Sequence, residues 1–419
     1  MKWICSQIGA REHYAIPRVL HRLGKLECLY TDIWAGTLWR TLGSFLRRPI
    51  LSSRFHFDLT DAKVESFDLT TVVDSVFGGY LKKNPYDWFL YVGNDFGRSV
   101  VESLNGKNGI NCKELIFFGY DTGFLEPAQW VKARGGKAIV CQMDPSRIEV
   151  NIVKEEEKCW PGWAKRSYQI PDSYFQRREK EWEAADLVMV NSEWTKNALV
   201  SQGVAVDKMI VIPLAYETEK NIQQISIGRR KRVDDHPSHL SSGCLFSSAR
   251  PLRVLFLGQV ILRKGIQYLI GAAELLQSEP VKFDVVGPIG ISEEAVRAAP
   301  SNMTFHGSIS RDKASKYFMN ADLYVLPTLS DGFALTQLEA MAYGLPVITT
   351  LHCGKVVTDG VDGTIVPSRD AKALAEAVCS LIRDTEKLES MQRATEVKGV
   401  QFSMEVLGGH LKALENHLK

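Results

Sequence analysis

Residues 321–350 read "ADLYVLPTLSDGFALTQLEAMAYGLPVITT". Two apolar runs, 321–327 and 346–350, enclose a polar turn and a segment, 334–343, that has the apolar spacing of a helix. Strands buried on both faces are almost wholly apolar, and two parallel strands need a crossover that is usually a helix. The stretch therefore predicts one strand–helix–strand unit of a parallel sheet.

The same alternation continues on both sides of this unit. Apolar runs that predict strands lie at 252–258, 281–287, 303–307, 321–327, 346–350 and 364–367. Helical patterns separate them at 265–277, 292–299, 311–320, 334–343 and 371–383. Apolar strands that alternate with helices are typical of a Rossmann-like domain, here expected at 251–400.

The N-terminal half repeats this organisation less regularly. Strands are expected within 2–9, 88–93, 114–119, 137–143 and 185–190. The stretch "ADLVMVNSEWTKNAL" (185–199) parallels "ADLYVLPTLSDGFAL" (321–335) in its order of strand, polar turn and helix. This likeness favours an α/β fold of two similar doubly wound domains, the N-terminal one at 1–215.

Two further segments are assigned separately. Residues 216–250 are polar, lack periodicity and carry "GRRKR" at 228–232, so they are expected to form an insertion beside the interdomain hinge. Residues 401–419 are expected to form a helix that packs back towards the N-terminal domain.

Composition restricts the class of protein. At 419 residues the chain is too long for one core and suits two domains. A net charge of +2 argues against a nucleic-acid partner, since such binders carry a strong basic excess. The eight cysteines form no CxxC pair, which favours reduced thiols in a cytoplasmic protein. The sequence shows neither a signal peptide nor a run of about eighteen apolar residues that would span a membrane.

The turn at 328–335 has features of an anion site. A helix N-terminus presents unpaired N–H groups that favour phosphate, and Gly332 allows a close backbone approach. Asp331 and Glu339 either cap the helix and face solvent, or both hold hydroxyl groups of one elongated ligand. If Glu339 lies about two turns into the helix, the carboxylates are roughly 10 Å apart, which suits the sugar and ribose of a nucleotide-sugar.

A second phosphate feature follows the first strand of this domain. The loop "GQVILRKG" (258–265) places Arg263 and Lys264 at the start of the next helix. The helix dipole repels cations at this end, and an anionic ligand would remove the conflict.

These motifs carry a family resemblance. The segments "GQVILRKGIQYL", "MTFHGSI", "DGFALTQLEAMAYGLPVI" and "DGVDGTIVP", in this order between 258 and 367, resemble the donor domain of family 4 retaining glycosyltransferases of GT-B fold. The resemblance implies two Rossmann-like domains that face a central cleft and bind a nucleotide-diphospho-sugar without a metal ion or other cofactor.

The resemblance also implies roles for individual residues. Asp331 matches a glutamate that contacts the hydroxyls of the donor sugar, Glu339 matches one that binds the ribose, and Lys264 matches a lysine that neutralises the diphosphate. The expected donor-binding residues are Gly258, Gln259, Gly307, Ser308, Gly332, Phe333, Ala334, Leu335 and Glu339. The expected catalytic residues are Asp331, Lys264, Arg263 and Asp144.

Three positions depart from the family pattern. Asp331 is one methylene shorter than the glutamate it matches. Gln259 stands where an arginine is common, and Arg263 is expected to supply the missing charge. Asp144, within "CQMDPSR", stands where the family usually has a histidine near the donor sugar.

The acceptor side is less determined. The first N-terminal loop offers Gly9, Ala10, Arg11 and His13 for contact with acceptor and phosphate, and the alternative is a helix start with a surface ion pair. Residues 36–56 mix aromatic, leucine and arginine side chains, so they either make peripheral contact with an anionic membrane or pack over the acceptor cleft.

The function predicted from these features is a metal-independent retaining glycosyltransferase with a nucleotide-sugar donor and an unassigned acceptor. Two alternatives stay open at this stage. One is a noncatalytic nucleotide-sugar binding module, which the aspartates at 331 and 144 suggest. The other is a nucleotide-sugar epimerase of the same fold.

Overall fold

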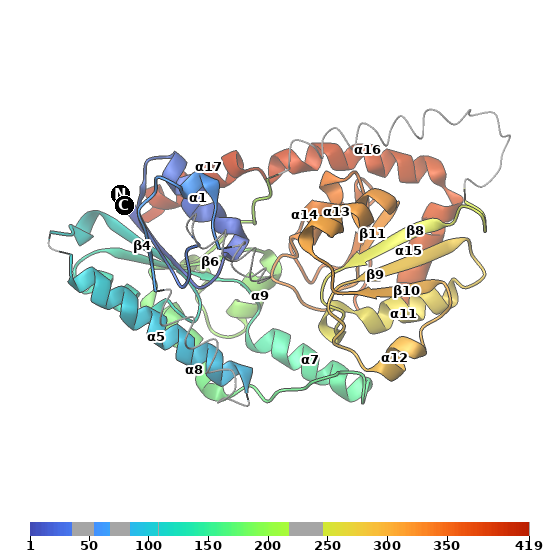
Figure 1. Cartoon of the computed structure of the whole chain (residues 1–419), viewed down its shortest axis with the longest axis horizontal. Helices are drawn as coiled ribbons and strands as arrows, with labels where there is room; N and C mark the ends of the chain where they lie inside the picture. Colours follow the sequence, from blue (N-terminus) through green and yellow to red (C-terminus); the bar gives the residue numbers. More distant parts are fainter. Residues whose placement is uncertain (36–53, 68–83, 108, 218–245, 419) are drawn as a thin grey trace.

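The computed structural model describes residues 1–35, 54–67, 84–107, 109–217 and 246–418. Nearly all of the 36–56 segment and most of the 216–250 insertion therefore lie outside the described residues. The described chain forms two α/β domains side by side, as Figure 1 shows, and the expected pair of doubly wound domains is confirmed.

The N-terminal domain is built on a seven-stranded parallel sheet. Its strand order, β3-β2-β1-β4-β5-β6-β7, makes the chain change direction across the sheet between β1 and β4. The strands are β1 (Lys2–Gln7), β2 (Leu26–Thr31), β3 (Val64–Ser66), β4 (Leu115–Tyr120), β5 (Lys137–Gln142), β6 (Leu187–Val190) and β7 (Met209–Val211). The helices are α1 (Ala15–Arg22), α5 (Pro85–Asn105), α6 (Leu125–Lys132), α7 (Arg147–Cys159), α8 (Asp172–Ala184) and α9 (Glu193–Val200). Single 3-10 turns are η1 (Arg11–Tyr14), η2 (Phe57–Leu59), η3 (Cys112–Glu114) and η4 (Val206–Lys208).

The expected strand at 88–93 is wrong, because these residues belong to helix α5. The side chain of Asn84 caps this helix by accepting a hydrogen bond from the N–H of Tyr86, and Pro85 is its first residue. Its buried residues recur at helical spacing: Gly93, Phe96, Gly97, Val100 and Leu104. The Asn-Pro pair is a helix start signal that the apolar run obscured. Strands β2, β3 and β7 were not predicted from the sequence.

The C-terminal domain contains a six-stranded parallel sheet in the order β10-β9-β8-β11-β12-β13. Its strands are β8 (Leu252–Leu257), β9 (Val281–Val286), β10 (Met303–Gly307), β11 (Leu323–Leu326), β12 (Val347–Thr349) and β13 (Gly363–Ile365). Its helices are η5 (Leu262–Lys264), α11 (Ile266–Leu275), α12 (Glu293–Arg297), α13 (Arg311–Asn320), α14 (Thr336–Ala342), α15 (Ala371–Arg383) and α16 (Thr385–Gln401). Every strand and helix expected in this domain is present.

Helices cover both faces of each sheet. In β1 the side chains of Trp3 and Cys5 enter a hydrophobic cluster with α1 and α17 (Met404–Leu418), whereas Ile4 enters the opposite cluster with α5 and α6. Alternate residues of a strand point to opposite faces, so both sets must be apolar when both faces are covered. This explains the continuous apolar runs in the sequence.

Helix α17 returns to the N-terminal domain after α16 has packed on the C-terminal domain (Figure 1). Its buried leucines, Leu407, Leu411 and Leu414, join the cluster around α1. The carboxylate of Glu415 accepts a hydrogen bond from the amino group of Met1 at 2.9 Å. The last helix is thus an integral part of the N-terminal domain.

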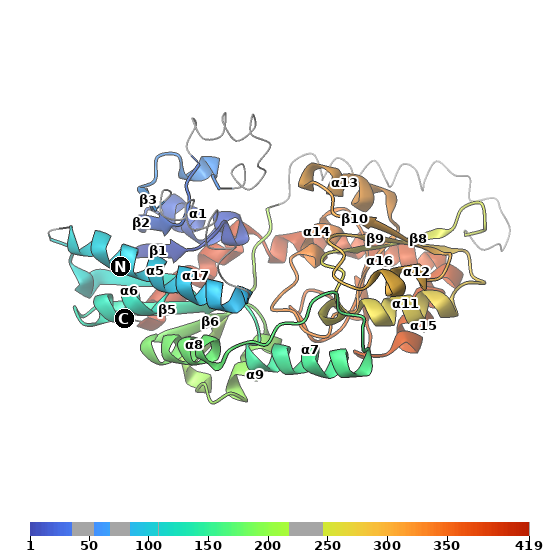
Figure 2. The same ribbon diagram turned by 60° about the horizontal axis from the view of Figure 1, so that its bottom comes forward.

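Helix α7 follows β5 of the N-terminal sheet but packs against the C-terminal domain (Figure 2). The carboxylate of Glu156 accepts hydrogen bonds from Gln267 Nε2 at 2.8 Å and from the Tyr268 hydroxyl at 2.9 Å. The N–H of Lys165 donates to the carbonyl of Gly290 at 2.9 Å. Helix α7 and the segment that follows it therefore attach one domain to the other through Glu156 and Lys165.

The domains also touch where β5 ends. A Cβ atom on Gly332 would lie 1.8 Å from the carbonyl oxygen of Met143, so only glycine permits this approach. The side-chain amide of Asn191 donates to the same carbonyl at 3.0 Å. Gly332 therefore serves the contact between the domains.

Gly332→Ala should lower the free energy of unfolding by about 1–3 kcal/mol, because the added methyl group overpacks this contact. Urea unfolding followed by tryptophan fluorescence measures the change. Gly409→Ala is the matched control, since a Cβ there meets no atom within 4 Å. In helix α17, Gly409→Ala should leave the free energy of unfolding unchanged or raise it by about 0.5–1 kcal/mol. If both substitutions change the free energy of unfolding equally, the close approach of Gly332 to Met143 does not contribute to stability.

Candidate active site

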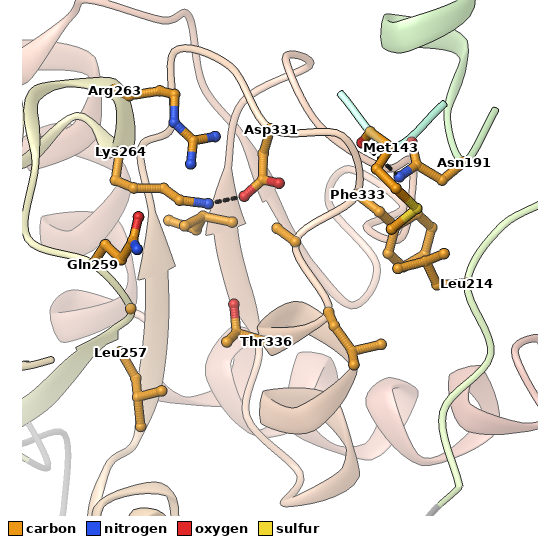
Figure 3. Close-up of a pocket in the computed structure, with 14 residues that line it drawn as sticks. Met143, Asn191, Leu214, Leu257, Gln259, Arg263, Lys264, Asp331, Phe333 and Thr336 are labelled. Atoms are coloured by element: carbon orange, nitrogen blue, oxygen red, sulfur yellow. Dashed lines mark hydrogen bonds and ion pairs between the residues drawn. The ribbon is translucent and has the colours of Figure 1, made fainter. Parts of the chain in front are cut away.

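The candidate site lies where β8 and β11 are neighbours in the C-terminal sheet. The chain leaves these adjacent strands in opposite directions across the sheet, so their following loops enclose a crevice, the usual ligand position in doubly wound sheets. A cavity of about 320 Å³ occupies this position. Its lining residues are Met143, Asn191, Leu214, Leu257, Gly258, Gln259, Arg263, Lys264, Leu326, Asp331, Phe333, Ala334, Leu335 and Thr336 (Figure 3).

The two C-terminal loops are held against each other by backbone contacts. The N–H of Leu329 donates to the carbonyl of Arg263 at 2.9 Å. Gly265 caps α11 with a φ of 74°, and a Cβ at this position would lie 1.9 Å from the carbonyl oxygen of Pro327. Only glycine combines this backbone conformation with such a close approach. The contact fixes the position of Lys264 relative to the turn that contains Asp331.

Lys264 and Asp331 form an ion pair across the cavity (Figure 3). Both side chains are largely shielded from solvent, with exposed fractions of 14% and 15%. Burial, together with the neighbouring Arg263 guanidinium, lowers the pKa of Lys264 to about 7. The carboxylate of Glu149 opposes this shift because it favours the charged ammonium.

Arg263 belongs to a second network that crosses between the domains. Its Nη1 donates to Glu149 Oε2 at 3.2 Å and to the carbonyl of Ser330 at 3.0 Å. The hydroxyl of Ser330 donates to the same Glu149 oxygen at 2.9 Å. Burial raises the pKa of Glu149, and the Arg263 guanidinium acts in the opposite direction. Both cations of the loop thus face carboxylates.

Helix α14 starts later than the sequence suggested. Ala334 has a φ of 61°, a left-handed conformation that cannot begin a right-handed helix, and α14 starts at Thr336. Glu339 consequently lies in the first turn of the helix instead of two turns in. The side chain of Gln337 donates to the carbonyl of Phe333 at 2.9 Å, which fixes the turn over the cavity.

The cavity gathers part of the expected donor set. Gly258, Gln259, Arg263, Lys264, Asp331, Phe333, Ala334 and Leu335 line it. Among the residues that the structure describes, Gly307, Ser308, Gly332, Glu339 and Asp144 do not. Gly307 ends β10 with a φ of 68°, and its carbonyl accepts a hydrogen bond from the N–H of Gly287, so Gly307 and Ser308 border the next loop of the same sheet edge.

Asp144 is held by an arginine of its own domain. Both of its carboxylate oxygens accept hydrogen bonds from Arg178, at 2.7 and 2.8 Å. Arg178 also pairs with Asp121 at 2.6 Å. Although burial acts in the opposite direction, the Arg178 guanidinium holds the pKa of Asp144 below its ordinary value. Asp144 is therefore a charged residue next to the Met143 wall of the cavity.

The first N-terminal loop follows β1 at the switch point of the N-terminal sheet. The N–H of Gly9 donates to Asp32 Oδ1 at 2.9 Å, and Ala10 precedes the turn η1 that contains Arg11 and His13. Glu12, His13 and Tyr14 all have positive φ, at 50°, 52° and 61°. Such residues cost about 1–2 kcal/mol each and are concentrated at functional sites. The loop lies at the expected acceptor edge but does not line the cavity.

Burial raises the pKa of Glu12, in the strained loop, to about 7. Other residues at or beside the cavity were not predicted from the sequence. Met143 and Asn191 form the wall contributed by the N-terminal domain. Asn191 directly follows β6, and polar residues at the carboxyl ends of parallel strands are a signal that could have identified it. Glu149 lies inside a helix, and no sequence pattern points to it.

Two further observations concern metals and membranes. Within the described ranges, no three His, Cys, Asp or Glu side chains gather as they would around a metal ion. The described helices include none with the length and apolarity that crossing a bilayer requires.

Comparisons with known proteins show what the C-terminal domain and the fold resemble. Residues 251–384 match the model of the family Glycosyl transferases group 1. A putative colanic acid biosynthesis glycosyltransferase, WcaL of Escherichia coli, is 25% identical over 227 residues, 49% of this chain and 56% of the relative. The amylovoran biosynthesis glycosyltransferase AmsK of Erwinia amylovora is 23% identical over 283 residues, 64% of this chain and 60% of the relative. The chain thus spans somewhat more than half the length of these relatives.

Two solved structures share the whole architecture. HepE of Anabaena in complex with UDP is 14% identical and covers 100% of both chains with a TM-score of 0.63. Sucrose-phosphate synthase of Thermosynechococcus elongatus is 16% identical, with a TM-score of 0.65 over 100% of this chain and 99% of the other. At these identities the likeness concerns the fold. Residues 251–384 therefore match the glycosyl transferases group 1 family, and the whole chain has the two-domain GT-B fold.

Proposed function

We propose that this protein is a retaining glycosyltransferase that moves a sugar from a nucleotide-diphospho-sugar to an acceptor hydroxyl without a metal ion. The observation that carries the proposal is the cavity between the β8 and β11 loops, which brings together Arg263, Lys264 and Asp331. A diphosphate needs cations and amide donors, whereas a sugar needs oriented acceptors for its hydroxyls. The cavity presents both kinds of group close enough together to contact a single nucleotide-sugar.

The donor diphosphate takes the position next to Arg263 and Lys264. A phosphate oxygen competes with Asp331 for the ammonium of Lys264, so donor binding exchanges one ion pair for another. Asp331 is then available to accept hydrogen bonds from the sugar hydroxyls. The backbone of Phe333, Ala334 and Leu335 faces the sugar and phosphates, and Glu339 binds the ribose, as the family resemblance implies.

Transfer requires the leaving diphosphate to be stabilised as the glycosidic bond breaks. Preorganised cations do this without reorganisation cost at the moment of reaction. Retention implies that the acceptor hydroxyl attacks from the face that the diphosphate leaves, and the leaving phosphate assists its deprotonation. The acceptor approaches from the N-terminal side, where the strained loop with Gly9, Ala10, Arg11 and His13 lies.

The names of the relatives support a role in carbohydrate biosynthesis. WcaL, AmsK and the CapM protein of Staphylococcus aureus are named as colanic acid, amylovoran and capsular polysaccharide glycosyltransferases. We place this protein in the same broad class. The UDP complexes of HepE support a nucleotide-sugar as the donor.

A noncatalytic nucleotide-sugar binding module is the second candidate. It is favoured by Asp144, which stands where the family usually has a histidine and is bound by Arg178 through both carboxylate oxygens. Such a module would bind donor tightly without turnover.

A thermal-shift screen of UDP-, GDP- and ADP-sugars tests the proposed function. A ligand present at one hundred times its dissociation constant stabilises the folded state by about 2.7 kcal/mol, which raises the unfolding temperature measurably. Nuclear magnetic resonance then follows slow hydrolysis of the selected donor and the anomer first released, which should be the retained one. Binding without hydrolysis supports the module, and no shift with any donor contradicts both candidates.

Lys264→Ala and Arg263→Ala should each slow donor turnover by about 10²-fold, which corresponds to roughly 2.7 kcal/mol of lost stabilisation of the leaving group. Rates at saturating donor measure the effect. Lys282→Ala removes an exposed cation of β9 in the same domain and should change the rate little. If Arg263→Ala behaves like this control, Arg263 does not replace the family arginine at Gln259.

Donor turnover should survive EDTA, and added magnesium or manganese should change it little. The reason is that Arg263, Lys264 and the turn amides already offset the charge of the diphosphate. Initial rates before and after chelation, with the metal ions added back, give the answer. A rate that collapses with EDTA and returns with manganese would exclude the metal-free mechanism.

A further inference from the structure

Glu149 lies in the first turn of α7, the helix that leaves the N-terminal sheet and packs against η5. Its Oε2 accepts hydrogen bonds from Arg263 Nη1 at 3.2 Å and from the Ser330 hydroxyl at 2.9 Å. The Glu149 side chain is 18% exposed. A single shielded carboxylate therefore contacts the loop after β8 and the loop after β11.

The direction of each hydrogen bond in this network is determined. Trp194 Nε1 can only donate, and it donates to the Ser330 hydroxyl oxygen at 3.2 Å. The single proton of that hydroxyl is therefore directed to Glu149. The indole of Trp194 is in turn stacked on His352, with ring centroids 4.1 Å apart and planes 14° apart. The position of Glu149 Oε2 is thus fixed from both domains.

Charge gives this geometry a role at the cavity. Arg263 and Lys264 are adjacent cations, and the charge of Arg263 disfavours the charged form of Lys264, whereas that of Glu149 favours it. Asp331 contacts Lys264, and Glu149 contacts Arg263. Asp331 lines the cavity and Glu149 does not. A diphosphate can therefore displace Asp331 while Glu149 continues to support Arg263.

We propose that Glu149 is a positioning residue of the donor site, contributed by the N-terminal half of the chain, that orients the Arg263 guanidinium towards the donor diphosphate. The proposal rests on the function proposed above. Glu149 acts through Arg263 and does not contact the donor. Its contribution should depend on the presence of both the diphosphate and Arg263.

A double-mutant cycle with calorimetric titration tests this proposal. The proteins are wild type, Glu149→Ala, Glu149→Gln, Arg263→Ala and Glu149→Ala/Arg263→Ala. The probes are UDP and uridine, or the diphosphate and nucleoside of the base that the screen selects. Glu149→Ala should weaken diphosphate binding about tenfold and leave nucleoside binding unchanged, within the range of coupling seen between contacting residues. Glu149→Gln, which keeps an acceptor without the charge, should lose less.

In the Arg263→Ala background, Glu149→Ala should have no further effect. Glu155→Ala is the matched control, because Glu155 lies on the same helix and pairs with Arg369 of the C-terminal domain at 2.8 Å, away from the cavity. Diphosphate affinity should be unchanged in that variant.

Four results would overturn the proposal. Additive losses from Glu149 and Arg263 would show that the residues act independently. An equal loss with Glu155→Ala, or a parallel loss of nucleoside affinity, would make Glu149 a structural link between the domains. Failure of the wild-type protein to bind any diphosphate would remove the proposed function itself, and this inference with it.

Discussion

The arrangement of the site depends on the adjacency of β8 and β11 in a sheet whose strands are all parallel. Parallel strands end on the same edge, and these two are far apart in the chain. The loops that follow these strands therefore lie against each other. Because Gly265 has no Cβ, its backbone can contact the carbonyl of Pro327. The same rule applies to β1 and β4 in the other domain. In each domain, the loops that follow these strands consequently lie at the same edge of the sheet.

The charges around the cavity follow from this adjacency. Two cations next to a helix start would be unfavourable alone, but each contacts a carboxylate from a segment distant in sequence. Asp331 comes from the same domain, whereas Glu149 comes from a helix that began in the other one. The cavity is therefore electrostatically balanced before any anion arrives, and an incoming diphosphate must compete with Asp331 for Lys264.

The sequence predicted the C-terminal domain well because its strands are buried on both faces and its helices are regularly spaced. It failed at 88–93, where a helix buried along one side has an aromatic start that resembles a strand. The donor loops were predictable because glycine, cations and carboxylates cluster locally in the chain. The contact of Glu149 with Arg263 and the pairing of Asp144 with Arg178 were not predictable from the sequence. These contacts join residues separated by more than thirty positions and depend on how helices pack.

The placement of α17 has a consequence for how the chain acquires its structure during synthesis. The hydrophobic face that contains Trp3 and Leu20 is closed by Leu407, Leu411 and Leu414, which emerge from the ribosome after the entire second domain. Domains generally fold as units in order of synthesis. Here, however, the N-terminal domain stays incomplete until helix α17 has been synthesised. The second domain, whose strands and covering helices α11 to α16 are contiguous, can complete its core while that apolar face is still exposed.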